Sequence, residues 1–153
     1  MPTAPTLTPS NASLGYGAIF STGVLASGSV TYTAVANIAS ISFEGFTVPE
    51  VDVTNLLSPN MTKESIPGLL TPGSISLTGQ FTNDAGQAEL VTLGTSRTVF
   101  PFEVTAALNG GKTYTLQGNG YVTKLSRGPF EADKSVEFKA DIKVSGAFLE
   151  TIA

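Results

Sequence analysis

Alternating apolar and polar positions predict several β-strands in this chain. Between residues 74 and 81, Ile75, Leu77 and Phe81 alternate with serine, threonine and glutamine. Between residues 135 and 144, apolar residues alternate with serine and charged residues. Successive side chains of a strand point to opposite faces of a sheet, so one face of each stretch is expected in the core.

Further strands are predicted over residues 18–25, 97–108 and 112–125. A longer strand is predicted over residues 30–43, where the apolar positions change from even to odd numbers, which indicates a bulge or burial on both faces. Pro101 indicates that the strand over residues 97–108 lies at a sheet edge. Asn109-Gly110-Gly111 is typical of a hairpin turn.

One short helix is predicted over residues 84–93. Asp84 and Gln87 have the spacing of a capping box. In this motif the side chain of the first residue accepts from the backbone amide of the second, and the side chain of the second accepts from the backbone amide of the first. Leu90 and Leu93 share one face of the helix. Gly94 is a natural C-terminal stop.

Strands joined by hairpins, with one short helix, predict a mostly β fold. We expect an antiparallel β-sandwich or a partly closed barrel with one short α-helix. The length of 153 residues fits one domain, which we place at residues 17–153. Residues 1–16 contain three prolines and are expected to form an extended N-terminal arm.

A long hairpin loop is predicted at about residues 47–73, between two of these strands. Loops longer than about 12–15 residues are uncommon in compact domains and are usually functional or disordered, and disordered segments are poor in large apolar residues. We therefore expect the loop to contact another subunit, with packing on its own body as the alternative. The candidate contact residues are Leu56, Leu57, Met61, Ile66, Leu69 and Leu70.

Composition narrows the range of partners. Charged residues make up 13% of the chain, about half of the typical ~25%, and a surface of low charge favours association. The net charge is −4 and there is no run of Lys or Arg, so we expect no tight electrostatic binding of nucleic acid. No apolar stretch approaches the ~20 residues that span a bilayer, and the N-terminus does not have the pattern of a signal peptide. We expect synthesis in the cytoplasm and no membrane partner.

The residue inventory disfavours catalysis. The chain has no His and no Cys, which excludes Ser-His and Cys-His nucleophile pairs. A hydrolase with paired carboxylates stays open, with Glu50/Asp52 or Glu131/Asp133 as candidates on strand faces. Solvated strand faces commonly carry such pairs. We therefore predict no catalytic, cofactor-binding or metal-binding residues.

The run VDVTNLLSPNMTKESIPGLLTPGSISLTGQF, the helix NDAGQAELVTL and the strand DIKVSGAF together resemble the major tail tube protein of long flexible-tailed (siphovirus-type) bacteriophages. The order and spacing of these motifs carry the resemblance, which covers residues 45–148. Residues 1–16 show none, and the C-terminal immunoglobulin-like domain of some relatives is not recognised.

The resemblance implies a virion protein whose hexameric rings stack into a tube that conducts the genome out of the capsid. It implies contacts with other copies of the chain, a tape measure protein, a tail terminator and a tail-tip initiator. DNA would pass without specific binding. Residues 74–82 and 135–145 become candidates for the inner wall, and an acidic, cation-poor wall would let DNA slide. The lumen-facing candidates are Glu131, Asp133, Glu137, Asp141, Ser76, Thr78 and Gln80.

Two other interpretations of the sequence stay open. One is a non-catalytic β-sandwich module that binds a surface or a carbohydrate, although the chain has no Trp for stacking on sugar rings. The other is the tube ring of a contractile secretion system, which belongs to the same structural class as the tail tube.

Overall fold

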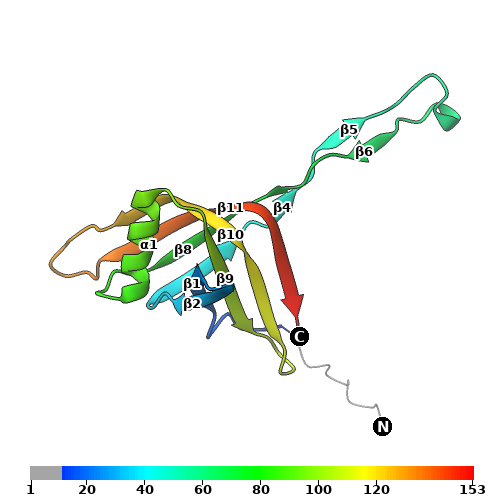
Figure 1. Ribbon diagram of the computed structural model, residues 1–153. Coiled ribbons are helices and arrows are strands. Elements are labelled where there is room, and N and C mark those ends of the chain that lie inside the picture. Colours follow the sequence, from blue (N-terminus) through cyan, green and yellow to red (C-terminus); the bar gives the residue numbers. More distant parts are fainter. Residues whose placement is uncertain (1–11) are drawn as a thin grey trace, which may run out of the picture.

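The computed structural model describes residues 12–153, and most of the expected N-terminal arm, residues 1–11, lies outside the described residues. The main sheet is antiparallel, with the strand order β2-β1-β9-β10-β11-β8-β3 (Figure 1). Its strands are β1 (Ile19–Ala26), β2 (Ser29–Ala34), β3 (Ile38–Phe43), β8 (Ser74–Gln80), β9 (Phe100–Ala107), β10 (Thr113–Arg127) and β11 (Glu137–Ile152).

The sheet is curved but not a closed barrel. Its two edge strands, β2 and β3, are consecutive in sequence, so the short connection between them runs from one edge of the sheet to the other. At this connection the Val35 amide donates to the Phe20 carbonyl of β1 over 2.9 Å. The prediction of a mostly β, antiparallel fold is confirmed, and of the two arrangements left open the partly closed barrel describes this sheet better.

Two details of the strand predictions are wrong. Residues 30–43 form two strands rather than one bulged strand, and Asn37 between them adopts a left-handed conformation with φ of 59°. The strand with Pro101 is not an edge strand, because β9 lies between β1 and β10. Pairing of β1 with β9 ends at Thr22 and Phe102. Pro101 lies just beyond this pair, so its lack of a backbone N–H removes no hydrogen bond to β1.

The predicted helix is α1 (Ala85–Ser96), and its N-cap is Asp84. The Asp84 carboxylate accepts from the amides of Gly86 and Gln87 at 3.0 and 3.3 Å. The helix passes the expected stop at Gly94 and ends at Arg97, which is left-handed with φ of 55°. The predicted capping box is not formed, because the Gln87 side chain turns inward instead of reaching back to Asp84.

The start of α1 fastens the connection between the two sheet edges. Asp84 accepts from the Ala36 amide at 3.0 Å, and the Gln87 side-chain amide donates to the carbonyls of Ala36 and Gln80 at 3.1 and 2.8 Å. Gly86 packs directly on the backbone of Val35, where a Cβ would lie 2.7 Å from Cα. Helix and sheet therefore enclose one core, whose buried residues include Phe20, Val35, Leu77, Leu90, Phe102, Leu116, Phe138 and Ile142.

A hairpin leaves the sheet between β3 and β8 and projects from the body (Figure 1). Two short antiparallel ladders hold it together, β4 with β7 near the sheet and β5 with β6 farther out. Its elements are β4 (Phe46–Thr47), β5 (Glu50–Asp52), the 3-10 turn η1 (Pro59–Met61), β6 (Ser65–Pro67) and β7 (Thr71–Pro72). No helix among the described residues is long and apolar enough to cross a membrane.

Candidate assembly interface

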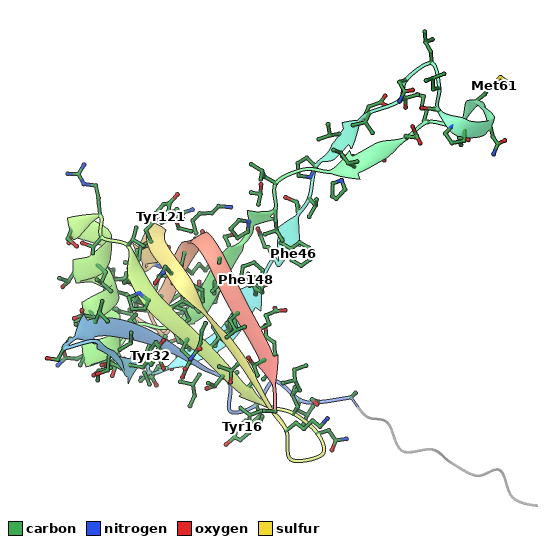
Figure 2. All side chains as sticks on the ribbon, turned by 45° about the vertical axis from the view of Figure 1, so that its right-hand side comes forward. Tyr16, Tyr32, Phe46, Met61, Tyr121 and Phe148 are labelled. Carbon is green, nitrogen blue, oxygen red and sulfur yellow. The ribbon has the colours of Figure 1, made fainter. Side chains whose placement is uncertain are left out.

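The six predicted contact residues all lie on the projecting hairpin, and all are exposed. Leu56, Leu57 and Met61 occupy its tip, residues 56–61, and are at least 91% exposed. Ile66 lies on β6, and Leu69 and Leu70 lie between β6 and β7, all at least 49% exposed. The alternative that this loop packs on its own body is wrong, because β5 and β6 contact chiefly each other (Figures 1 and 2).

Polar side chains hold the outer part of the hairpin in shape. Glu64 and Thr54 bond each other across the two arms of the hairpin, the Glu64 amide donating to Thr54 Oγ1 at 2.8 Å. The Ser58 hydroxyl donates to Glu64 Oε2 at 2.6 Å, and the Leu57 amide donates to Asn55 Oδ1 at 2.8 Å. Because these bonds use the polar groups, the leucines of the tip are left pointing into solvent.

The root of the hairpin is anchored by aromatic rings. Phe43 at the end of β3 meets Phe148 of β11 edge-to-face, with ring centroids 5.6 Å apart and planes at 77°. The Phe46 ring also meets Phe148, with ring centroids 6.3 Å apart and planes at 36°. Aromatic pairs of this geometry contribute about 0.5–1.5 kcal/mol beyond the area that they bury. The body therefore fixes the direction in which the hairpin leaves it.

Four further apolar residues of the hairpin were not among the sequence candidates. They are 40–55% exposed and continue the apolar surface from the root toward the tip. The signal for them was present in the sequence as an alternation of apolar residues on the first strand of the hairpin. These residues are Phe46, Val48, Val51 and Val53.

Five of the seven predicted lumen residues lie together on the outer side of the main sheet, opposite the core. In the pairing of β8 with β11, Ser76 faces Asp141 and Gln80 faces Glu137. Thr78 lies between them, opposite Lys139. The remaining two candidates, Glu131 and Asp133, are not on a strand, because β11 begins only at Glu137. Glu131 instead pairs with Lys134 of the same loop at 3.0 Å.

This outer surface of β8, β10 and β11, which we call the polar face, is not acidic. The registers of β10 and β8 against β11 put Lys124, Lys139 and Lys143 on it beside Glu137 and Asp141. Lys139 lies 3.5 Å from Glu137, and Lys143 donates to the Pro72 carbonyl at 2.7 Å. The expected acidic, cation-poor wall is therefore wrong for these strands, since three lysines stand beside the two carboxylates, among hydroxyl and amide side chains.

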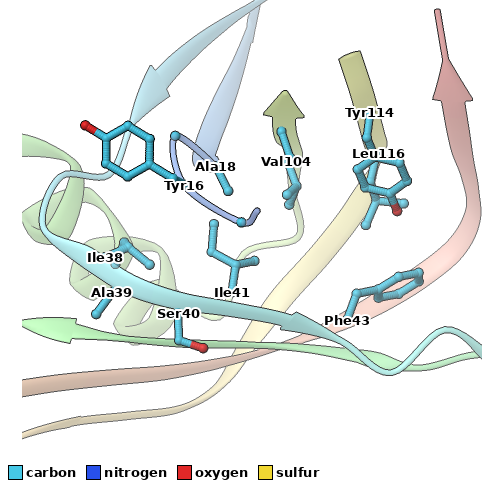
Figure 3. Close-up of a pocket in the computed structure, with 13 residues that line it drawn as sticks. Tyr16, Ala18, Ile38, Ala39, Ser40, Ile41, Phe43, Val104, Tyr114 and Leu116 are labelled. Carbon is cyan, nitrogen blue, oxygen red and sulfur yellow. The ribbon is translucent and has the colours of Figure 1, made fainter. Parts of the chain in front are cut away.

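A pocket of about 600 Å³ opens at the inner side of the curved sheet, between residues 15–18 and β3 (Figure 3). We call it the mouth pocket. Sequence reasoning missed it, because its walls come from four separate parts of the chain. No lining residue carries a formal charge, and the side chains in view are Tyr16, Ala18, Ile38, Ala39, Ser40, Ile41, Phe43, Val104, Tyr114 and Leu116.

Tyr114 is the titratable group of the mouth pocket that departs from its usual behaviour. Burial, together with its hydrogen bond to Glu150 at 2.8 Å and the charge of that carboxylate, raises the pKa of Tyr114 to about 12. The phenol is therefore neutral at ordinary pH, and the bond holds its ring against the wall of the pocket.

The two carboxylate pairs considered for catalysis lie on exposed segments. Glu50 and Asp52 are both on the hairpin strand β5, and hydrogen bonds from the Thr54 side chain and amide lower the pKa of Asp52. The other pair lies in the loop before β11. Among residues 12–153, no group of three or more Asp and Glu residues is arranged to hold a metal ion.

No protein-family model and no curated protein sequence matches the chain. Solved structures do match its fold. A chain from the tail of an empty gene transfer agent (GTA) particle, refined with helical C6 symmetry, superposes with a TM-score of 0.70 at 20% identity, covering 92% of this chain and 99% of that one. The SPP1 tail tube gives 0.63 at 15% identity, with coverages of 90% and 77%.

The likeness extends to contractile systems. The cap that terminates the tube of the anti-feeding prophage (AFP) superposes with a TM-score of 0.66 at 14% identity, covering 99% of this chain and 98% of that one. Identities this low show a common fold. The resemblance found in the sequence is confirmed at that level, and the chain has the fold of phage-type tail tube proteins.

Proposed function

We propose that this chain is a structural subunit of a hollow tail-type tube, assembled from rings of identical copies. The observation that carries the proposal is the projecting hairpin, whose tip exposes Leu56, Leu57 and Met61 on a chain with the tail-tube fold. A hairpin with nothing to pack against on its own body needs a partner to bury this surface. The C6 symmetry of the matching GTA tail supports rings of six.

The hairpin supplies the free energy of subunit association. Fully burying a Leu or Met side chain contributes about 1.5–3 kcal/mol, so the three tip residues together contribute several kcal/mol per contact. Because the same chain presents both the hairpin and its receiving surface, contacts of this kind are head-to-tail and close into rings or propagate as filaments.

The polar face is the proposed wall of the channel. Its serine and threonine hydroxyls and its mixed charges, three lysines beside two carboxylates, offer DNA neither a strong attraction nor a strong repulsion. Lys139 lies 3.5 Å from Glu137, and Lys124 is the register partner of Asp141, so carboxylates lie beside two of the three lysines. Genomic DNA would then slide without specific binding.

The remaining assignments follow from this role. The protein would reside in the virion tail after synthesis in the host cytoplasm and would have no enzymatic activity. Its expected partners are other copies of itself, a tape measure protein, a tail terminator and a tail-tip initiator. The fold match to the AFP tube-terminating cap supports self-assembly beside a terminating protein.

A tube of a contractile injection system is the second candidate. The specific observation in its favour is a sheath-tube complex of an extracellular contractile injection system (PVC), which matches with a TM-score of 0.64 over 90% of this chain at 12% identity. Isolating the tube with its native neighbours separates the two, because a contractile system has a sheath around the tube.

Electron microscopy of concentrated protein tests the proposal. In one variant, an Asn-Gly turn replaces residues 54–63, which lie between the hydrogen-bonded Val53 and Glu64 and therefore suit a two-residue connection. In a second variant, Leu56→Ser and Leu57→Ser remove the apolar tip alone. Lys63→Ser is the matched control, since it changes an exposed residue of the same hairpin and keeps the tip apolar.

We expect hollow tubes or stacked rings from the wild-type chain and the Lys63→Ser control. The two tip variants should stay unassembled while their thermal unfolding matches the wild type. Tubes from all four proteins would refute the role of the hairpin. A monodisperse monomer from the wild type at every concentration, even when seeded with tail tips, would favour the surface- or carbohydrate-binding module instead.

A further inference from the structure

The mouth pocket is a mostly apolar concavity that residues 12–153, the described part of the chain, leave unfilled. Its volume is about 600 Å³, and Ile41, Phe43 and Val104 contribute to its walls. Small-molecule sites of similar size usually place several polar groups at fixed positions. Here the lining has no charged side chain, and the Tyr114 hydroxyl is already bonded to Glu150. These features suit an apolar, uncharged occupant.

The hairpin tip is a matching projection on the same chain. Residues 56–61 carry no charge, while charged residues of the hairpin lie behind the tip, among them Asp52 on β5 and Glu64 just before β6. Leu56 and Leu57 are at least 91% exposed. A cavity opened by removing one leucine side chain measures about 150 Å³, so the mouth pocket has room for two or three side chains of the tip.

The chain's own hairpin does not occupy this pocket, because it projects away from the body (Figure 1). A projection and a hollow on different surfaces of one chain make a head-to-tail contact when one copy meets the next. We propose that the mouth pocket receives Leu56 and Leu57 from the hairpin tip of a neighbouring copy. This inference rests on the proposed tube function and names the receiving site for its hairpin.

Two features prepare the pocket for this occupant. The bond to Glu150 holds Tyr114 in place as one wall. Tyr16 lines the pocket near its opening and is 92% exposed, so its ring has little to pack on until a second copy arrives (Figure 3). Insertion of the tip would cover both rings.

Cysteine cross-linking in assembled tubes tests the contact. The chain has no Cys, so introduced thiols are the only ones present. Leu57→Cys at the tip is combined with Ala106→Cys or with Ala18→Cys, two small residues that line the pocket. Leu57→Cys with Thr105→Cys is the matched control, because Thr105 neighbours Ala106 on β9 with similar exposure but points to the opposite face. Leu7→Cys with Ala106→Cys tests whether the N-terminal segment is the occupant.

After oxidation, at least one tip-and-pocket pair should give a ladder of covalent oligomers on a non-reducing gel, and the Thr105 control should give at least tenfold less. Tubes that form without a tip-and-pocket ladder, or with equal linkage in the control, would overturn the proposal and leave the tube function intact. A disulfide formed by the Leu7 pair alone, seen as a ladder or as an intrachain bond that shifts the monomer band, would overturn it in favour of the N-terminal segment. If neither the variants nor the wild type form tubes, the proposed tube function fails. The same cysteine pairs are then oxidised in concentrated soluble protein. Absence of the ladder there overturns the contact between hairpin tip and mouth pocket.

Discussion

Ser76 donates its hydroxyl hydrogen to Asp141 Oδ1 at 3.0 Å, across the pairing of β8 with β11. The bond joins two strands that lie 65 positions apart in sequence and sits in the middle of the polar face. It shows that a hydroxyl and a carboxylate of this face satisfy one another. With Glu137 lying 3.5 Å from Lys139, both carboxylates of the polar face have a polar partner.

Replacing the two carboxylates of the polar face with lysines should make assembled tubes hold DNA. Glu137→Lys with Asp141→Lys adds cations beside Lys139 and Lys143, and clustered cations bind DNA by releasing its condensed counterions. We expect short duplex DNA to be retained by tubes of this variant at low salt and released as salt rises.

The control for this prediction is Glu131→Lys with Asp133→Lys, which makes the same change of charge in the loop before β11. Retention of DNA by the loop variant alone would contradict the assignment of the polar face to the channel wall. Equal retention by both variants would show a general effect of net charge.

Gln87→Leu should strongly destabilise the subunit. The Gln87 side chain is 1% exposed, accepts from the Thr82 amide and donates to the carbonyls of Ala36 and Gln80. Leucine leaves these backbone groups without their partner, at about 1–3 kcal/mol for each buried group. We expect chemical denaturation to show a fall of roughly 2–4 kcal/mol in the free energy of unfolding.

Gln80→Leu is the comparison for that variant, because the Gln80 side chain is exposed on the polar face. Its free energy of unfolding should stay within about 0.5 kcal/mol of the wild type. A similar loss in both variants would mean that the bonds of Gln87 do not fasten the helix to the sheet edges.

Two glycines of α1 should respond in opposite directions to alanine. A Cβ on Gly86 would lie 2.7 Å from Val35 Cα, so Gly86→Ala should lower the free energy of unfolding by about 1–3 kcal/mol despite the better helix propensity of alanine. A Cβ on Gly94 meets the side chain of Val122 at 3.4 Å, an ordinary contact. Gly94→Ala should therefore raise the free energy of unfolding by up to about 1 kcal/mol. Stabilisation by both substitutions would disprove the close approach at Gly86.

Stability should fall as the pH rises through the titration of Tyr114. The pKa of Tyr114 is raised from 10.0 to about 12 by burial and by Glu150, so between these values the folded chain keeps a proton that the unfolded chain has lost. The contribution is fully present below pH 10 and is lost toward pH 12. Tyr114→Phe should remove this part of the pH dependence, and Glu150→Gln should reduce it. An unchanged slope in the Phe variant would contradict the assignment.

The sequence was sufficient for the features that depend on local pattern. Alternation located the core-facing residues of β8 and β11, and Asp84 marked the start of α1. The apolar content of a long loop singled out the hairpin as the candidate contact element. In each case neighbouring residues carry the information.

The features that the sequence did not reveal depend on long-range arrangement. Whether residues 30–43 formed one strand or two was decided by the position of β2 and β3 at opposite sheet edges. The balance of charge on the polar face depends on Lys124, which a register shift in β10 places opposite Asp141. The mouth pocket likewise exists only once the sheet has curved.

Cryo-electron microscopy of tubes assembled from the wild-type chain tests the central claim most directly. We predict a hollow tube of six-fold rings, with the polar face of β8, β10 and β11 on the channel wall and the hairpin tip buried in a neighbouring subunit. A filament with no channel, or a tube in which Leu56 and Leu57 remain in solvent, would contradict the account.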